Sequence, residues 1–83
     1  MTMTSGKKVL LVDDDDELRT ALGEQLELHE EFVTDMAATG AQGLEIAKSG
    51  HYDILLLDVG LPDMDGRDAC RLMRRKGVKS PII

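Results

Sequence analysis

The chain has 83 residues, of which 42% are hydrophobic and 31% charged, so we expect a single soluble domain. Its formal net charge of −6 and its lack of a basic stripe argue against direct binding to nucleic acid. The sequence has neither the long apolar run of a membrane span nor the apolar N-terminal stretch of a signal peptide. The lone Cys70 cannot form an internal disulfide, and we expect a cytoplasmic protein without a membrane partner.

The first predicted elements are a strand over residues 7–12 and a helix over residues 15–29, which follow an N-terminal tail of residues 1–6. Four apolar residues in succession end the strand, a pattern typical of a strand buried on both faces of a parallel sheet. Aspartates 13–16 follow directly. Leu18 and Leu22 belong to an apolar series at helical spacing, so we expect an amphipathic helix with acidic residues in its first turn.

Two more strands and two more helices are predicted along the rest of the chain. Residues 32–34 indicate a short second strand, and residues 53–57 carry the strongest strand pattern. Pro and Gly mark residues 60–66 as a loop, and "SPII" at residues 80–83 begins a fourth strand. The second helix should begin after Thr39 and end near Gly50, and its buried residues should be Ala41, Leu44 and Ala47. The third helix should cover residues 67–76 and end at Gly77, and its buried residues should be Ala69, Cys70 and Met73.

Alternation of strands and helices predicts an α/β fold with a parallel sheet and right-handed crossovers. In such a sheet the carboxyl ends of all strands lie at one edge, and ligands bind there. Asp13 and Asp14 follow the first predicted strand, and Asp58 follows the third. If these two strands are neighbours, as in a doubly wound sheet of order 2-1-3, the three carboxylates converge on one spot.

Three converging carboxylates repel one another, and a hard divalent cation with oxygen ligands relieves that repulsion. Magnesium in particular binds one or two protein carboxylates together with phosphate oxygens. A carboxylate is also a nucleophile toward phosphorus and forms an aspartyl phosphate. Asp58 is the hardest aspartate to explain structurally, because a charge that ends an apolar run is costly unless it is paired. The other aspartates have structural interpretations: Asp15 and Asp16 at a helix start, Asp63 and Asp65 as loop formers, Asp53 at the opposite edge and Asp35 solvated.

The segments "KKVLLVDDDDELR", "YDILLLDVGLPDMDG" and "SPII" resemble the receiver domain of bacterial two-component response regulators, over residues 7–83. The resemblance implies an incomplete (βα)5 receiver, flavodoxin-like, with a doubly wound parallel sheet of order 2-1-3-4. Such a receiver is a signalling domain rather than a classical enzyme. By resemblance, Asp58 is the phospho-acceptor, and Mg²⁺ is held by Asp13, Asp14, Asp58 and the backbone carbonyl of Gly60.

The same resemblance implies partners and an output. A histidine kinase or a phosphotransfer protein would supply the phosphoryl group, and phosphorylation would switch an output activity such as transcription. DNA would be bound only through an output domain outside these residues. The family's switch Ser or Thr and its Lys lie beyond Ile83, so an alternative is a non-phosphorylated pseudo-receiver or a truncated interaction module. An uncovered sheet edge would then favour a homodimer or exchange of elements between two copies.

Other aspartate-based sites fit the sequence less well. A haloacid-dehalogenase-type phosphatase needs Asp-x-Asp after its first strand, whereas Asp58 follows the third strand and Gly60 stands two residues later. The "DMDG" segment lacks the oxygen ligands of an EF-hand at Leu61 and Leu72. Neither a dinucleotide-binding nor a P-loop glycine pattern is present.

Overall fold

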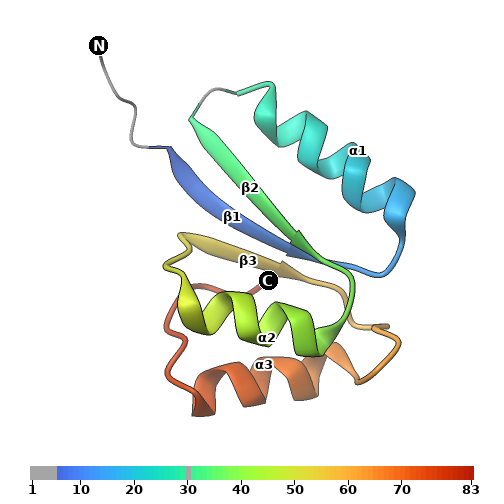
Figure 1. Ribbon diagram of the computed structural model, residues 1–83, viewed down its shortest axis with the longest axis vertical. Helices are drawn as coiled ribbons and strands as arrows, with labels where there is room; N and C mark the ends of the chain where they lie inside the picture. The colour runs from blue at the N-terminus through green and yellow to red at the C-terminus, as the bar shows by residue number, and fades with distance from the viewer. Residues whose placement is uncertain (1–5, 30) are drawn as a thin grey trace.

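The computed structural model describes residues 6–29 and 31–83, where three strands alternate with three helices (Figure 1). The predicted tail over residues 1–6 lies outside this part of the chain, apart from Gly6. In chain order the elements are β1 (Lys7–Val12), α1 (Asp16–Glu27), β2 (Phe32–Ala37), α2 (Gly40–Ser49), β3 (Ile54–Leu57) and α3 (Gly66–Arg75). The α/β alternation that the sequence predicts is therefore confirmed.

The sheet is parallel and has the strand order β2-β1-β3, with β1 at its centre. Leu11 of β1 pairs with Met36 of β2 and with Leu56 of β3. Helices α2 and α3 lie together on one side of the sheet, and α1 lies on the other (Figure 1). This is the doubly wound arrangement in which the carboxyl ends of β1 and β3 are adjacent.

The C-terminal segment adds to the same sheet beside β3. The Leu55 amide donates to the Pro81 carbonyl at 2.9 Å, and the Ile83 amide donates to the Leu55 carbonyl at 2.9 Å. The Leu57 amide continues the ladder by donating to the Ile83 carbonyl at 2.9 Å. The bridge between Leu55 and Ile82 is parallel, so the predicted fourth strand begins where order 2-1-3-4 requires it.

The main core lies between the sheet and the pair α2 and α3. Leu10 and Val12 of β1, Leu55 of β3 and Met73 of α3 are fully buried in it. Gly43 of α2 approaches β1 so closely that an added Cβ would lie 2.8 Å from Val12 Cγ2. This close approach holds α2 against β1, the strand that ends directly before Asp13.

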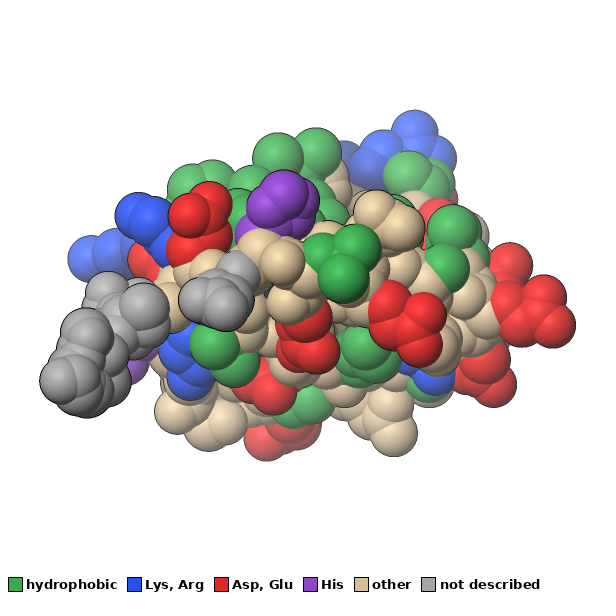
Figure 2. All heavy atoms as spheres, turned by 90° about the horizontal axis from the view of Figure 1, so that it is seen from above, with side chains coloured by type: hydrophobic (Ala, Val, Ile, Leu, Met, Phe, Trp, Pro, Cys, Tyr) green, Lys and Arg blue, Asp and Glu red, His purple; other side chains and the backbone are tan. Residues whose placement is uncertain are grey.

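Helix α1 differs from the sequence prediction in its end, and part of its apolar series is exposed. It ends at Glu27 rather than His29, and Asp15 caps it by accepting from the Leu18 amide. Leu18 and Leu22, which belong to the apolar series of this helix, are 46% and 38% exposed. The reason is that no second helix covers this side of the sheet within the described residues. Figure 2 shows exposed hydrophobic side chains among acidic ones on the face seen from above Figure 1.

Smaller corrections concern the other elements. β2 continues to Ala37, because its register with β1 extends over six residues and not three. Ala41 is exposed, since α2 turns its smallest residues, Gly40 and Gly43, toward its neighbours. Cys70 is half-buried, whereas the sequence suggested full burial. None of the helices in residues 6–29 and 31–83 is long and apolar enough to cross a membrane.

Tyr52 joins β2 to the C-terminal segment, at the opposite end of the sheet from Asp13, Asp14 and Asp58. Its hydroxyl donates to Asp35 at 2.6 Å, and its carbonyl accepts from the Ser80 hydroxyl at 2.5 Å. Asp35 is exposed, as expected, but it lies inside β2 rather than at its end, and its carboxylate has a partner in Tyr52. Burial first, and then the bond to Asp35, raise the pKa of Tyr52 from 10.0 to about 12.

Gly43→Ala should lower the free energy of unfolding by about 1–3 kcal/mol, because Val12 is stiff and fully buried and cannot move away from a new methyl group. Gly23→Ala in α1 is the matched control. There the nearest atom is the end of the flexible Met36 side chain, and the helix gains about 1 kcal/mol of propensity. Urea unfolding of both variants measures the difference. Equal losses would contradict the close packing of α2 on β1.

The tyrosinate absorbance of Tyr52 should titrate near pH 12 rather than near pH 10. The signal is unambiguous, because the chain has one tyrosine and no tryptophan. Since the folded pKa is the higher one, this contribution to stability is complete below about pH 10 and is lost as the pH rises toward 12. Asp35→Asn should lower the pKa only in part, because burial remains the larger cause. A pKa near 10 in the folded wild type would contradict the Tyr52–Asp35 contact.

Candidate functional site

Asp13, Asp14 and Asp58 come together at the carboxyl edge of the sheet. Each offers one carboxylate oxygen, and these oxygens all lie within 4.8 Å of one another. Asp14 is exposed, whereas Asp13 and Asp58 are half-buried. The Asp58 amide donates to the Val12 carbonyl at 2.9 Å, so the β1–β3 pairing itself sets the distance between the carboxylates. The predicted convergence is therefore present.

The turn that carries Asp13 and Asp14 is held by hydrogen bonds within the first turn of α1. The Asp13 carboxylate accepts from the Asp15 amide at 2.9 Å, and the Asp13 carbonyl accepts from the Arg19 guanidinium at 2.5 Å. Arg19 also forms an ion pair with Asp16, and its side chain is only 14% exposed. Sequence reasoning missed Arg19. The signal was its place one helical turn after the cap Asp15, from which a long side chain reaches back to the turn.

The loop between β3 and α3 begins at Asp58 and returns close to it. The Gly66 amide donates to the Val59 carbonyl at 2.8 Å, and Gly60 pairs with Asp65 in a short antiparallel bridge. An added Cβ at Gly66 would overlap the Asp58 carbonyl oxygen. The start of α3 therefore packs directly on the backbone of Asp58. Gly60, the predicted carbonyl ligand, is exposed in this loop and has open space around its Cα.

Asp63 and Asp65, expected to be simple loop formers, both bind backbone amides at helix starts. Asp65 caps α3 by accepting from the Arg67 amide at 2.8 Å, and the Arg67 side chain holds the pKa of Asp65 at about 2. Asp63 reaches across to α2, where it accepts from the Gly40 amide at 2.8 Å and from the Ala41 amide at 2.9 Å. These two bonds lower the pKa of Asp63. Nothing in the local sequence signals this contact, because its partners are more than 20 residues away in the chain.

The chemistry of the three carboxylates fits a divalent cation. Magnesium binds oxygen at about 2.0–2.1 Å in octahedral geometry, so its ligand oxygens lie about 3–4 Å apart. The observed spread of 4.8 Å needs only small side-chain movements to reach that range. Exposure on the Asp14 side leaves room for the waters that magnesium keeps.

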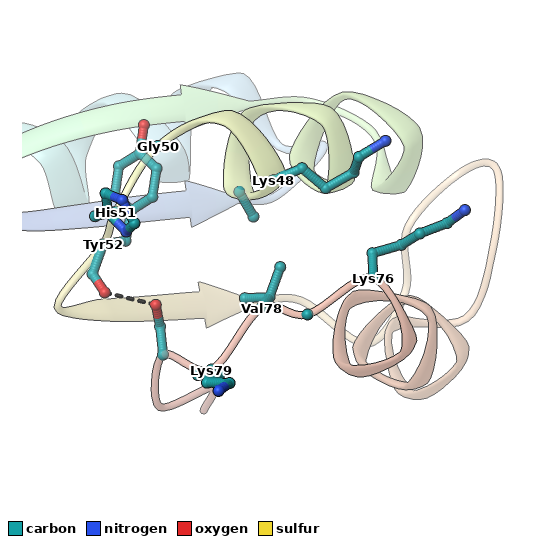
Figure 3. Close-up of a pocket in the computed structure, with 10 residues that line it drawn as sticks. Lys48, Gly50, His51, Tyr52, Lys76, Val78 and Lys79 are labelled. Atoms are coloured by element: carbon teal, nitrogen blue, oxygen red, sulfur yellow. Dashed lines mark hydrogen bonds between the residues drawn. The ribbon is translucent and has the colours of Figure 1, made fainter.

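The other aspartates and the histidines stand apart from this triplet. Asp53 accepts from the Lys8 amide at 2.7 Å at the amino edge of the sheet, as expected. His29 and His51 are exposed. A hollow of about 220 Å³ near His51 and Tyr52 also lies at the amino edge. Figure 3 shows that two of the three lysines that line it, Lys48 and Lys76, extend away from His51 and Tyr52.

Comparisons with known proteins agree with this geometry. The family model described as "Response regulator receiver domain" matches residues 9–83. The cell cycle response regulator CtrA of Brucella ovis is 38% identical over 79 residues, which cover 92% of this chain and 32% of CtrA. The receiver domain of the Francisella response regulator 1452 has a TM-score of 0.86 at 25% identity, covering 93% of this chain and 63% of that chain.

The response regulator TrrA of Thermotoga maritima has a TM-score of 0.83 at 33% identity, covering 92% of this chain and 65% of that chain. Structures of TrrA contain Mg²⁺ and BeF in one case and the histidine kinase ThkA in another. The present chain spans less than two thirds of each of these relatives.

Gly66→Ala should lower the free energy of unfolding by at least about 2 kcal/mol and shift the amide resonances of Asp58 and Val59, because the new methyl group would meet backbone that cannot rotate away. Gly60→Ala is the matched control in the same loop. Its Cβ meets nothing within 4 Å, so stability and the Asp58 resonance should change little. Urea unfolding and amide NMR spectra check both variants. A Gly66→Ala variant that behaves like Gly60→Ala would contradict the packing of α3 on Asp58.

Proposed function

This chain belongs to the response regulator receiver family, and we propose that Asp58 accepts a phosphoryl group from a histidine kinase or a phosphotransfer protein. The observation that carries the proposal is the convergence of Asp13, Asp14 and Asp58 within 4.8 Å at the sheet edge. Structural interpretations account for the other aspartates of the described residues, but a half-buried carboxylate beside two others needs a cation or a reaction partner. The known complex of TrrA with a histidine kinase supports the choice of partner.

In the proposed reaction, a carboxylate oxygen of Asp58 attacks the phosphorus atom of a phosphohistidine. A bond forms between that oxygen and phosphorus, and the bond between phosphorus and the imidazole nitrogen breaks. The nitrogen keeps the electron pair, and Asp58 becomes an acyl phosphate. Asp13, Asp14, Asp58 and the Gly60 carbonyl would hold Mg²⁺, which supplies positive charge to the phosphoryl oxygens. The presence of Mg²⁺ with BeF in TrrA supports this choice of cation.

Arg19 and Gly66 would set the geometry of the reaction. Arg19 binds the Asp13 carbonyl and so holds the turn that carries the two metal-binding carboxylates. Gly66 lets α3 start against the Asp58 backbone, which limits how far the nucleophile can move. Positioning of this kind is the main contribution that a protein makes to phosphoryl transfer.

The wider role follows from the family. We propose that phosphorylation, in the cytoplasm, switches an output activity, and that this output is transcription. Contact with DNA would then belong to an output domain, since these residues carry a net charge of −6. The relative CtrA is named a cell cycle response regulator, which supports regulation as the general role.

A phosphoramidate, which carries the same phosphorus–nitrogen bond as phosphohistidine, should add one phosphoryl group to the wild-type chain when Mg²⁺ is present. Intact-mass spectrometry measures the addition, and hydroxylamine should remove it because acyl phosphates react with this nucleophile. Asp58→Asn should abolish the modification, since an amide oxygen is a far weaker nucleophile. Asp53→Asn, at the other end of the same strand, should leave it unchanged.

A wild-type chain that folds but gains no phosphoryl group would contradict the proposal. The alternative is then an interaction module without phosphorylation, and the exposed Leu18 and Leu22 would supply an apolar surface for self-association. Light scattering across a range of concentrations separates the two readings, because the alternative predicts a concentration-dependent dimer.

A further inference from the structure

Two segments of the chain that are distant in sequence are joined at the β3–α3 loop, residues 58–65. The Asp63 carboxylate uses both oxygens, one for the Gly40 amide at 2.8 Å and one for the Ala41 amide at 2.9 Å. Both amides lie at the start of α2, where helix geometry leaves them without intrahelical acceptors. We call this contact the Asp63 clamp.

A second contact brings the same surfaces together. An added Cβ at Gly40 would lie 2.7 Å from Met64 Cγ and 2.8 Å from Met64 Sδ, so Met64 lies directly against the first residue of α2. Asp63 and Met64 are consecutive, and they bind α2 through polar and apolar groups respectively. Residues 63 and 64 of the loop are therefore held against the start of α2.

The same loop holds the groups on which the proposed metal site depends. Asp58 is its first residue, and Gly60 lies between Asp58 and the clamp. The base of the loop is closed by the Gly60–Asp65 bridge and by the bond from the Gly66 amide to the Val59 carbonyl. Only three peptide units separate Asp63 from Gly60, so the position of Asp63 limits the positions that Gly60 can take.

We propose that Asp63 is a positioning residue for the cation site: by clamping the β3–α3 loop to the start of α2, it holds Gly60 and Asp58 in the arrangement that binds Mg²⁺. This inference rests on the proposed function, because it concerns the same site. It assigns to Asp63 more than the capping of a helix. A cap alone would affect the stability of α2, whereas a positioning residue also changes the affinity for the cation.

The test measures the dissociation constant for Mg²⁺ by calorimetric titration of the full chain. Asp63→Ala removes both acceptors, and the affinity should fall about tenfold, the effect expected when a residue that orients a metal ligand is lost. Asp63→Asn loses the same charge but keeps an amide oxygen, so its affinity should fall between those of wild type and Asp63→Ala. The comparison of Asn with Ala separates the geometry of the clamp from the charge of the carboxylate.

Asp53→Ala is the matched control. Asp53 also binds a backbone amide, that of Lys8, at 2.7 Å, and its removal costs the same unit of charge at the opposite edge of the sheet. Its affinity for Mg²⁺ should stay within about twofold of wild type, even where urea unfolding gives a loss of stability equal to that of Asp63→Ala. If Asp63→Ala does not unfold cooperatively, the Mg²⁺ affinities of Asp63→Asn and Asp53→Asn are compared instead. Asp63→Asn should then bind Mg²⁺ about threefold more weakly than wild type, and Asp53→Asn should not.

Three results would overturn the inference. Unchanged Mg²⁺ affinity in Asp63→Ala would leave the proposed function standing and reduce Asp63 to a helix cap. Equal losses in Asp63→Asn and Asp63→Ala would assign the effect to charge. A wild-type chain without measurable Mg²⁺ binding would refute the proposed metal site and the inference together, and this result is distinct from the other two.

Discussion

The site depends on one constraint, the parallel pairing of β1 with β2 on one side and β3 on the other. Parallel hydrogen bonding puts the carboxyl ends of these strands at the same edge of the sheet. The hydrogen bond from the Asp58 amide to the Val12 carbonyl fixes the register of β3 against β1. Asp13 and Asp14 leave the end of β1, and Asp58 leaves the end of β3. Repulsion between these carboxylates destabilises the fold. Burial of the central strand, which is complete from Val9 to Val12, offsets this repulsion.

Around this edge of the sheet, glycine permits close backbone contacts, and hydrogen bonds from polar side chains hold the loops in place. Gly66 lets the start of α3 touch the Asp58 backbone, which no residue with a Cβ could do. Arg19 and Asp63 then hold the two loops of the site, one by donating to the Asp13 carbonyl and the other by accepting from α2. Together they restrict the loops that carry the candidate ligands, as pre-organised binding of a cation requires.

The two faces of the sheet are covered to different extents, and apolar periodicity predicted burial only in part. On the side of α2 and α3 it predicted Ala69 and Met73 as buried, and both are, whereas Ala41 is exposed and Cys70 is half-buried. On the side of α1 the predicted amphipathic helix is present, but Leu18 and Leu22 of its apolar series are exposed. Periodicity indicates which face of a helix is apolar, but burial also requires neighbouring elements that cover that face. Within the described residues, α1 has only the sheet as such a neighbour, because no second helix lies on its side.

The order of the elements and the parallel sheet could be predicted from sequence, because apolar runs, caps and strand ends are local patterns with few possible topologies. The convergence of Asp13, Asp14 and Asp58 depended in addition on β1 and β3 being neighbours, a strand order that the family resemblance implied. The tertiary structure decided the contacts that join distant segments. The bonds of Asp63 to α2 and of Asp35 to Tyr52 span 23 and 17 positions, and no local propensity encodes them. They depend on the distances between packed elements, which exist only once the sheet and its helices have come together.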